Sequence, residues 1–213
     1  MNLFRLLQAR ADEGRSVRVG VIGAGKFSSM FLSQARLTPG LHVVGIAELD
    51  PEKARQACLR TGWPQEALAF GTSTASIEDG AKQGKTVITG DARQLIESRL
   101  DVIVEITGVP EAGAQHAWRA LESGKHVVMV NVEADALLGP VLARKAEKAG
   151  LVYSMAYGDQ PALICDLVDW ARAAGFNVVA AGRGHKWLPH FAQSTPETVW
   201  GYYGLTPEQA KVG

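Results

Sequence analysis

The stretch Val17-Arg18-Val19-Gly20-Val21-Ile22-Gly23-Ala24-Gly25-Lys26-Phe27-Ser28 decides the fold of this chain. A β-branched run leads straight into two glycines, and a segment compatible with a helix follows from Phe27 to Ala35. A strand, a tight turn and a helix therefore come in the order that a dinucleotide-binding βα unit requires. The third glycine of the G-x-G-x-x-G pattern is replaced by Ser28, which is small enough to let the helix pack closely against the strand.

The residues of this turn are the candidate cofactor-binding residues. Gly23 is expected to make the sharp bend, and Gly25 to let the backbone approach a pyrophosphate. The free N–H groups at the start of the helix, around Lys26, Phe27 and Ser28, would face that anion. Lys26 adds a cation beside them. The sequence thus predicts that the chain binds NAD or NADP.

A second apolar run, Leu41 to Ala47, ends at Glu48. A carboxylate at this position can accept hydrogen bonds from both hydroxyls of the adenosine ribose, and its charge favours NAD over NADP. In the alternative interpretation, Glu48 only borders a turn, while Asp50 caps a helix that Pro51 opens.

The charges are balanced. Lys and Arg together number 22, and so do Asp and Glu, with no long run of one sign. Nothing in the charge therefore points to nucleic acid or to an anionic membrane surface as a partner. With 46% hydrophobic and 21% charged residues among 213, the chain has the composition of an ordinary globular protein. A small-molecule substrate is the expected partner.

The cysteines and the N-terminal residues indicate the compartment. Cys58 and Cys165 form no C-x-x-C pair, and we expect both to be buried thiols in a reducing environment. Residues 1–10 show an amphipathic pattern interrupted by Arg5 and Arg10, which is typical of a surface helix and not of a signal peptide. The apolar runs are far shorter than the roughly 20 residues that a membrane-spanning helix needs. The sequence predicts a cytoplasmic protein without a membrane partner.

Strand-like runs recur along the chain, with helical patterns between most of them. They are Val17–Ile22, Leu41–Ala47, Thr86–Thr89, Val102–Thr107, His126–Val130, Leu151–Met155 and Phe176–Ala181. This alternation predicts an α/β fold with a doubly wound parallel sheet of the Rossmann type. Residues 62–84, rich in Ser, Thr, Gly and Ala, are expected to be an irregular insertion with one short helix.

Three segments are expected in the domain organisation. A leading helix occupies residues 1–16, and the dinucleotide-binding domain occupies residues 17–182. The periodicity fades after residue 182, so residues 183–213 are expected to open an incomplete second domain with a catalytic and dimerising role. Trp170 follows Leu163 and Leu167 at helical spacing and is expected to lie in the core.

Polar residues follow the later strands of the predicted sheet. In an open parallel sheet the ligand lies beyond the carboxyl ends of the strands. Thr107 and Gly108 follow one strand, directly before a helix that Pro110 opens, and are expected to face the nicotinamide. Asn131 and Glu133 follow the next strand, and Asn131 could hold the nicotinamide carboxamide or a substrate hydroxyl.

Glu133, Asp159 and Lys186 are the candidate catalytic residues. An ammonium group at Lys186 can polarise a carbonyl during hydride delivery or clamp a phosphate. Asp159 can serve as an acid or as a metal ligand. In the alternative interpretations, Asp159 caps a helix that begins at Pro161, Glu133 is solvated, and Lys186 is a surface charge. The sequence does not identify a metal.

Five stretches of the chain resemble the homoserine-dehydrogenase-like oxidoreductases. They are the glycine turn and the stretches 130–135 (VNVEAD), 156–163 (AYGDQPAL), 168–172 (VDWAR) and 194–201 (STPETVWG). Within this family, the chain is similar to the branch that includes the 1-deoxy-D-xylulose 5-phosphate reductoisomerase-like enzymes. The resemblance implies an NAD(P)-binding domain followed by a catalytic domain through which the protein forms a homo-oligomer.

The resemblance also implies a reaction. Reductoisomerase-like enzymes rearrange a ketose phosphate and reduce it with NADPH and a divalent metal, which suits acidic groups at Glu133 and Asp159 and a cation at Lys186. The expected function is therefore hydride transfer between NAD(P) and a small polar, phosphorylated substrate. The alternatives are a homoserine dehydrogenase-type enzyme and a non-catalytic nucleotide-binding or sensing module.

Overall fold

The computed structural model describes residues 2–157, 160–182, 188–195, 197–202 and 206. Asp159 and Lys186, two of the three candidate catalytic residues, lie outside these residues. The chain divides into two compact units, residues 1–163 and residues 164–213. Among the described residues, no helix has both the length and the apolar character needed to cross a membrane.

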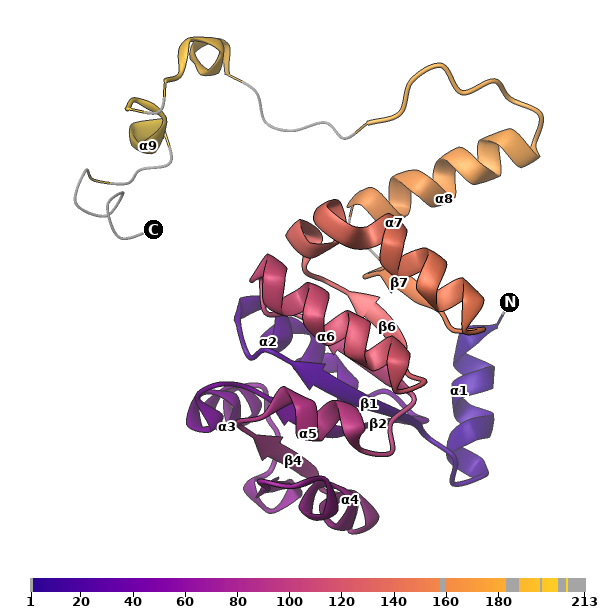
Figure 1. The fold of residues 1–213 in the computed structure, drawn as a ribbon, viewed down its shortest axis with the longest axis vertical. Coiled ribbons are helices and arrows are strands. Elements are labelled where there is room, and N and C mark those ends of the chain that lie inside the picture. Colours follow the sequence, from indigo (N-terminus) through magenta and orange to yellow (C-terminus); the bar gives the residue numbers. More distant parts are fainter. Residues whose placement is uncertain (1, 158–159, 183–187, 196, 203–205, 207–213) are drawn as a thin grey trace. The chain divides into compact units, whose positions relative to one another are not determined.

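The first unit is a parallel sheet flanked by helices (Figure 1). Its strands are β1 (Val17–Ile22), β2 (Leu41–Ala47), β3 (Leu68–Phe70), β4 (Thr86–Thr89), β5 (Val102–Glu105), β6 (His126–Met129) and β7 (Tyr153–Met155). Its α-helices are α1 (Leu3–Asp12), α2 (Lys26–Ala35), α3 (Pro51–Arg60), α4 (Thr74–Lys82), α5 (Ala92–Glu97), α6 (Pro110–Glu122) and α7 (Val132–Lys148), and a short 3-10 helix η1 spans Gln65–Ala67.

The strand order is β3-β4-β2-β1-β5-β6-β7, and every pairing is parallel. The chain runs outward from β1 through β2 in one direction and through β5 in the other, so the topological switch point lies at the carboxyl ends of β1 and β5. This arrangement confirms the predicted doubly wound Rossmann-type fold. It also fixes where a ligand site is expected, because open α/β sheets bind ligands at such a point.

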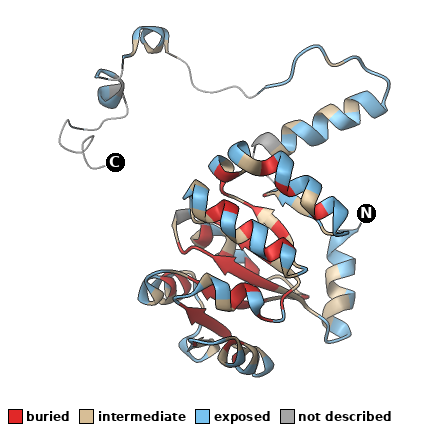
Figure 2. Ribbon diagram, in the orientation of Figure 1, coloured by how far each residue is buried: buried red, intermediate tan, exposed pale blue. Residues whose placement is uncertain are grey.

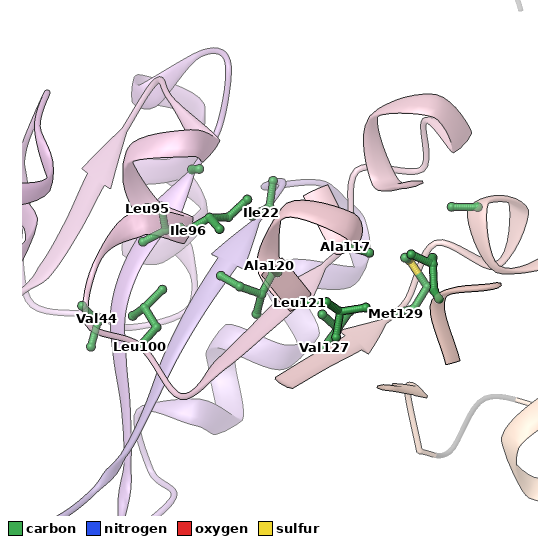
Figure 3. Packing of buried hydrophobic residues seen from close by; sticks show 14 of the residues in the cluster. Ile22, Val44, Leu95, Ile96, Leu100, Ala117, Ala120, Leu121, Val127 and Met129 are labelled. Atoms are coloured by element: carbon green, nitrogen blue, oxygen red, sulfur yellow. The ribbon is translucent and has the colours of Figure 1, made fainter. Parts of the chain in front are cut away.

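Two apolar cores lie on the two faces of the sheet. Side chains of α4, α5, α6 and α7 pack on one face, and Figure 3 shows Leu95, Ile96 and Leu121 among them. Side chains of α2 and α3, including Leu32 and Cys58, pack on the other face. Figure 2 shows the buried residues concentrated in the strands and on the helix sides that face the sheet. The sheet is thus covered on both faces, as parallel sheets require.

The region 62–84 is more regular than the sequence indicated. It contributes the edge strand β3, which pairs with β4, and the helix α4, whose Ile77 is fully buried. The prediction of an irregular insertion was therefore wrong in part. The strand β3 has only three residues, one of them the exposed Phe70, so the sequence shows no alternation of apolar and polar residues there.

The second unit differs from expectation in three ways. Its helix α8 (Gln160–Ala173) begins before residue 164, and the elements η2 (Pro189–Gln193) and α9 (Val199–Tyr202) follow it. Trp170 is 64% exposed and Cys165 is exposed, so neither is the buried residue that we predicted. The predicted strand Phe176–Ala181 is also wrong, since these residues form no regular element. A β-branched run becomes a strand only where it finds a neighbouring strand to pair with.

Cys58 behaves as predicted. It lies in α3 with no exposed surface, and burial raises the pKa of its thiol to about 11. At neutral pH it is therefore protonated and packs as a small apolar group.

Candidate cofactor-binding site

A cleft of about 340 Å³ opens at the carboxyl ends of the central strands, at the switch point. It is lined by the ends of β1, β2 and β5, by the loop after β4, by the first turns of α3 and α5, and by the first two turns of α6. The lining residues are Ile22, Gly23, Ala24, Gly25, Ala47, Glu48, Leu49, Lys53, Gly90, Ala92, Ile106, Thr107, Val109, Ala112 and His116. The structure therefore brings together Gly23, Gly25, Glu48 and Thr107 from the sequence-predicted cofactor residues.

The glycine turn has the geometry that the sequence predicted. Gly23 has φ +105°, and a Cβ there would lie 3.0 Å from the backbone carbon of Ile106, so only glycine fits. Gly25 precedes α2 with no side-chain cap and with open space around its Cα. The first N–H groups of α2 therefore have no side-chain cap, and a helix start of this kind can bind an anion.

The start of α2 packs tightly against β1. Ser28 is fully buried, and its Oγ donates to the carbonyl oxygen of Gly25 at 2.6 Å. The small side chain thus permits the close approach that a third glycine would provide. Phe27, in the same turn of α2, is exposed, and Lys26 is the first residue of the helix.

Glu48 lies between the glycine turn and the start of α3. Its Oε2 accepts a hydrogen bond from the backbone N–H of Ala24 at 2.7 Å, and the Nζ atom of Lys53 lies 3.7 Å from the same oxygen. The side chain of Glu48 is 13% exposed. Asp50 caps α3 by accepting from the N–H groups of Glu52 and Lys53. Asp50 is therefore the N-cap residue of α3, and Glu48 lines the cleft.

The opposite side of the cleft is formed by the loop after β5. Thr107 donates from Oγ1 to Oε1 of Glu105 at 2.6 Å, and the N–H of Val109 donates to Thr107 Oγ1 at 3.3 Å. Gly108 follows with φ +70°, a conformation that favours glycine. The hydrogen bonds of Thr107 to Glu105 and Val109 thus hold this loop in place without a ligand.

Glu105 is a functional candidate that sequence reasoning missed. It is the last residue of β5 and is fully buried, yet its carboxylate contacts two residues that line the cleft. Oε1 accepts from Thr107 and lies 3.3 Å from Nδ1 of His116, in the second turn of α6. The signal was a carboxylate ending an otherwise apolar strand, since buried charges are rare unless they are paired.

Asn131 has a supporting position. It is 2% exposed, caps α7 by accepting from the N–H of Ala134, and donates from Nδ2 to Val109 O at 3.0 Å and to Thr107 Oγ1 at 3.4 Å. It does not line the cleft, and its bonds join the start of α7 to the loop after β5. A contact with the nicotinamide or the substrate stays a prediction.

Two further acidic residues, Glu133 and Asp135, lie in the first turn of α7. Glu133 is exposed in the first turn of this helix, where a negative charge is favourable. Asp135 accepts a hydrogen bond from the hydroxyl of Tyr153 at 2.8 Å, and burial together with this contact raises the pKa of Tyr153. Among the described residues, no three His, Cys, Asp or Glu side chains gather as a metal site would require.

A second cavity, of about 720 Å³, lies between α5 and α6. It shares four lining residues with the cleft: Leu49, Gly90, Ala92 and His116. The two cavities therefore meet at the position directly after Glu48.

Comparison with known proteins relates the chain to two families. Residues 19–155 match the family described as the NAD-binding domain of homoserine dehydrogenase, and residues 158–212 match the catalytic domain of oxidoreductase DRL. No curated protein shows a significant match to this chain.

Several solved structures share the fold. An NAD-binding oxidoreductase from Klebsiella pneumoniae is 18% identical, with a TM-score of 0.52 and with 75% of this chain and 39% of that chain covered. The WlbA dehydrogenase from Bordetella pertussis, solved with NADH and UDP-GlcNAcA, is 18% identical with a TM-score of 0.51, covering 76% and 43%. A 3-ketoreductase from Actinomadura kijaniata, solved with NADP, is 21% identical with a TM-score of 0.50, covering 73% and 44%.

This chain thus spans about two fifths of the length of these solved structures. The family match confirms the predicted cofactor, NAD or NADP. Because the match over residues 19–155 covers well over half of the chain, the chain belongs to the homoserine dehydrogenase NAD-binding domain family and is an NAD(P)-binding oxidoreductase domain.

Proposed function

We propose that this chain carries the cofactor-binding part of an enzyme that transfers hydride between NAD(P) and a small polar substrate. The proposal rests on two neighbouring features of the glycine turn. The N–H groups that follow Gly25 at the start of α2 have no side-chain cap, and the Glu48 carboxylate accepts a hydrogen bond from the N–H of Ala24 beside them. A dinucleotide needs this combination, because its pyrophosphate is an anion and its adenosine ribose offers hydroxyl donors.

Residues on both sides of the cleft contact the cofactor in this function. The N–H groups at the start of α2 bind the pyrophosphate, and Gly23 and Gly25 let the cofactor approach the backbone. Glu48 accepts from the ribose hydroxyls and repels a 2′-phosphate, which favours NAD. Thr107 and Gly108 position the nicotinamide, which supplies the hydride acceptor or donor when the cofactor is bound.

Two candidates exist for the reaction. The resemblance of residues 130–135 and 156–163 favours a reductoisomerase-like reaction on a phosphorylated ketose with NADPH, with Glu133, Asp159 and Lys186 acting on the substrate or a divalent metal. The family match over residues 19–155 favours a homoserine dehydrogenase-type reaction. In both cases we propose that a following catalytic domain makes the homo-oligomer.

Titration with NADH and with NADPH tests the proposal, with energy transfer from tryptophan to the reduced nicotinamide as the signal. We expect both to bind and NADH to bind more tightly. Tighter binding of NADPH would overturn the role of Glu48 and support the reductoisomerase-like reaction. Binding of neither would overturn the cofactor site.

Assays of cofactor oxidation and reduction with each candidate substrate then distinguish the two proposed reactions. Consumption of NADPH with 1-deoxy-D-xylulose 5-phosphate would support the first candidate, and formation of reduced cofactor with homoserine would support the second. The purified protein is the sample for these assays. Tight cofactor binding without turnover of either substrate would favour a nucleotide-sensing module.

A further inference from the structure

We infer that His116, oriented by the buried carboxylate of Glu105, accepts a hydrogen bond from the 6-amino group of the cofactor's adenine. The inference rests on the proposed function, because it needs a bound NAD(P). It assigns a base-recognition role to a histidine in the second turn of α6.

The carboxylate of Glu105 is held in one orientation. Its Oε1 accepts from Thr107 Oγ1 at 2.6 Å and from Thr107 N at 3.3 Å, and lies 3.3 Å from His116 Nδ1. Its Oε2 has no hydrogen-bond partner among the described residues and faces Gly113, where a Cβ would lie only 2.9 Å away. Close packing on this side therefore leaves the carboxylate little freedom to turn.

This fixed carboxylate selects the tautomer of His116. An ionised carboxylate only accepts hydrogen bonds, so Nδ1 of the imidazole must carry the proton that it donates to Glu105. In the neutral ring, Nε2 then keeps a free lone pair and is an acceptor. The side chain of His116 is 23% exposed and lines both cavities, so the ring offers an acceptor to a ligand.

The position of the adenine follows from the position of the ribose. With the ribose at Glu48, the attached base reaches the residues shared by the two cavities, which begin with Leu49. Leu49 is 93% exposed, and together with Ala92 it offers apolar surface to the flat faces of a base. His116 is the one polar side chain of the four shared residues, so it meets the polar edge of the base. The donor on that edge of adenine is the 6-amino group.

The experiment compares NADH with reduced nicotinamide hypoxanthine dinucleotide, in which a carbonyl oxygen replaces the 6-amino group. We expect the wild-type chain to bind the hypoxanthine analogue roughly three- to tenfold more weakly, as expected for loss of one neutral hydrogen bond. In the His116→Phe variant, the two dinucleotides should bind with equal affinity. His116→Gln is the matched control, because its amide can donate to Glu105 and still accept from the amino group, and it should keep part of the preference.

Glu105→Gln is the conservative control for the orienting role. The amide oxygen can take the position of Oε1 and accept from Thr107 and His116, so this variant should keep the preference for adenine. Equal binding of the two dinucleotides by the wild type, or tighter binding of the hypoxanthine analogue, would overturn the inference. An unchanged preference in His116→Phe would overturn it as well. Failure of the wild type to bind either dinucleotide would instead overturn the proposed function.

Discussion

The two walls of the cofactor cleft each contain a glutamate at the end of a strand, but the two carboxylates differ in their surroundings. On the first wall, formed by the glycine turn and Glu48, the carboxylate is held by the N–H of Ala24 and stays partly exposed. On the second wall, formed by the loop after β5 and the start of α6, Glu105 is fully buried behind Thr107 and His116. The Glu48 carboxylate is thus accessible to a ligand, whereas the Glu105 carboxylate can act only through Thr107 and His116.

The energetic consequences should differ accordingly. A partly exposed carboxylate can be removed at small cost to the fold, because water replaces its partners. Removing a buried carboxylate that accepts from several donors lowers the stability of the fold, because these donors lose their acceptor at a place that water does not reach. Removing the Glu48 carboxylate should therefore change cofactor binding at little cost in stability, whereas removing the Glu105 carboxylate should lower stability.

The largest effect is expected at Gly23, where the two walls touch. A methyl group in Gly23→Ala would be forced against the backbone of Ile106 at a positive φ. We expect the free energy of unfolding to fall by about 3 kcal/mol and NADH binding to be lost. Urea denaturation and NADH titration measure the two effects.

Gly25→Ala is the matched control for Gly23→Ala. Gly25 has φ −75°, and a Cβ there meets no atom within 4 Å, so the variant should unfold like the wild type. If the pyrophosphate approaches this residue, NADH should nevertheless bind at least about tenfold more weakly. Wild-type affinity in Gly25→Ala would show that the cofactor does not approach the backbone at this position.

The next effect in size is expected at Glu105. Glu105→Ala removes the acceptor of Thr107 and His116 and leaves a cavity, so the free energy of unfolding should fall by about 2–3 kcal/mol. Glu105→Gln keeps the volume and one acceptor oxygen and should cost about 1 kcal/mol. Urea denaturation of both variants, with Glu48→Ala as the matched variant on the first wall, measures the difference. A loss in Glu48→Ala as large as in Glu105→Ala would remove the distinction between the walls.

The first wall could be predicted from the sequence because its signals are local. Strand, glycines and helix follow one another without a gap, and Glu48 ends the next apolar run. The same reasoning located the strands that became β1, β2, β4, β5, β6 and β7. It failed for Phe176–Ala181, where β propensity has no neighbouring strand to act on, and for the three-residue edge strand β3.

The second wall could not be predicted in the same way. Glu105 meets His116 only because α6 folds back over the end of β5, and Asn131 reaches the same loop from the start of α7. These contacts depend on the packing of three elements, and no spacing in the sequence encodes them. Asn131 was singled out for a ligand contact, which stays a prediction, and its hydrogen bonds to Thr107, Val109 and Ala134 could not be foreseen.

A smaller effect, confined to the ligand, is expected in Glu48→Gln. The amide oxygen can still accept from the N–H of Ala24, so the turn should keep its shape. Losing the charge should weaken NADH binding about five- to tenfold, or about 1 kcal/mol, and reduce the repulsion of the 2′-phosphate of NADPH. The ratio of the NADH and NADPH dissociation constants measures the effect. An unchanged ratio would mean that Glu48 does not contact the ribose.

The smallest effect is expected in Asp50→Ala. This variant distinguishes the capping of α3 by Asp50 from the proposed binding of the ribose by Glu48, two residues earlier. The variant removes the acceptor for the N–H groups of Glu52 and Lys53 and should lower the free energy of unfolding by about 1 kcal/mol. The ratio of NADH to NADPH affinity should stay the same, because the Ala24 N–H holds the Glu48 carboxylate independently of the helix cap. A changed ratio would show that Glu48 is positioned through the start of α3 and Lys53, and the first wall would then depend on a network behind it, as the second wall does.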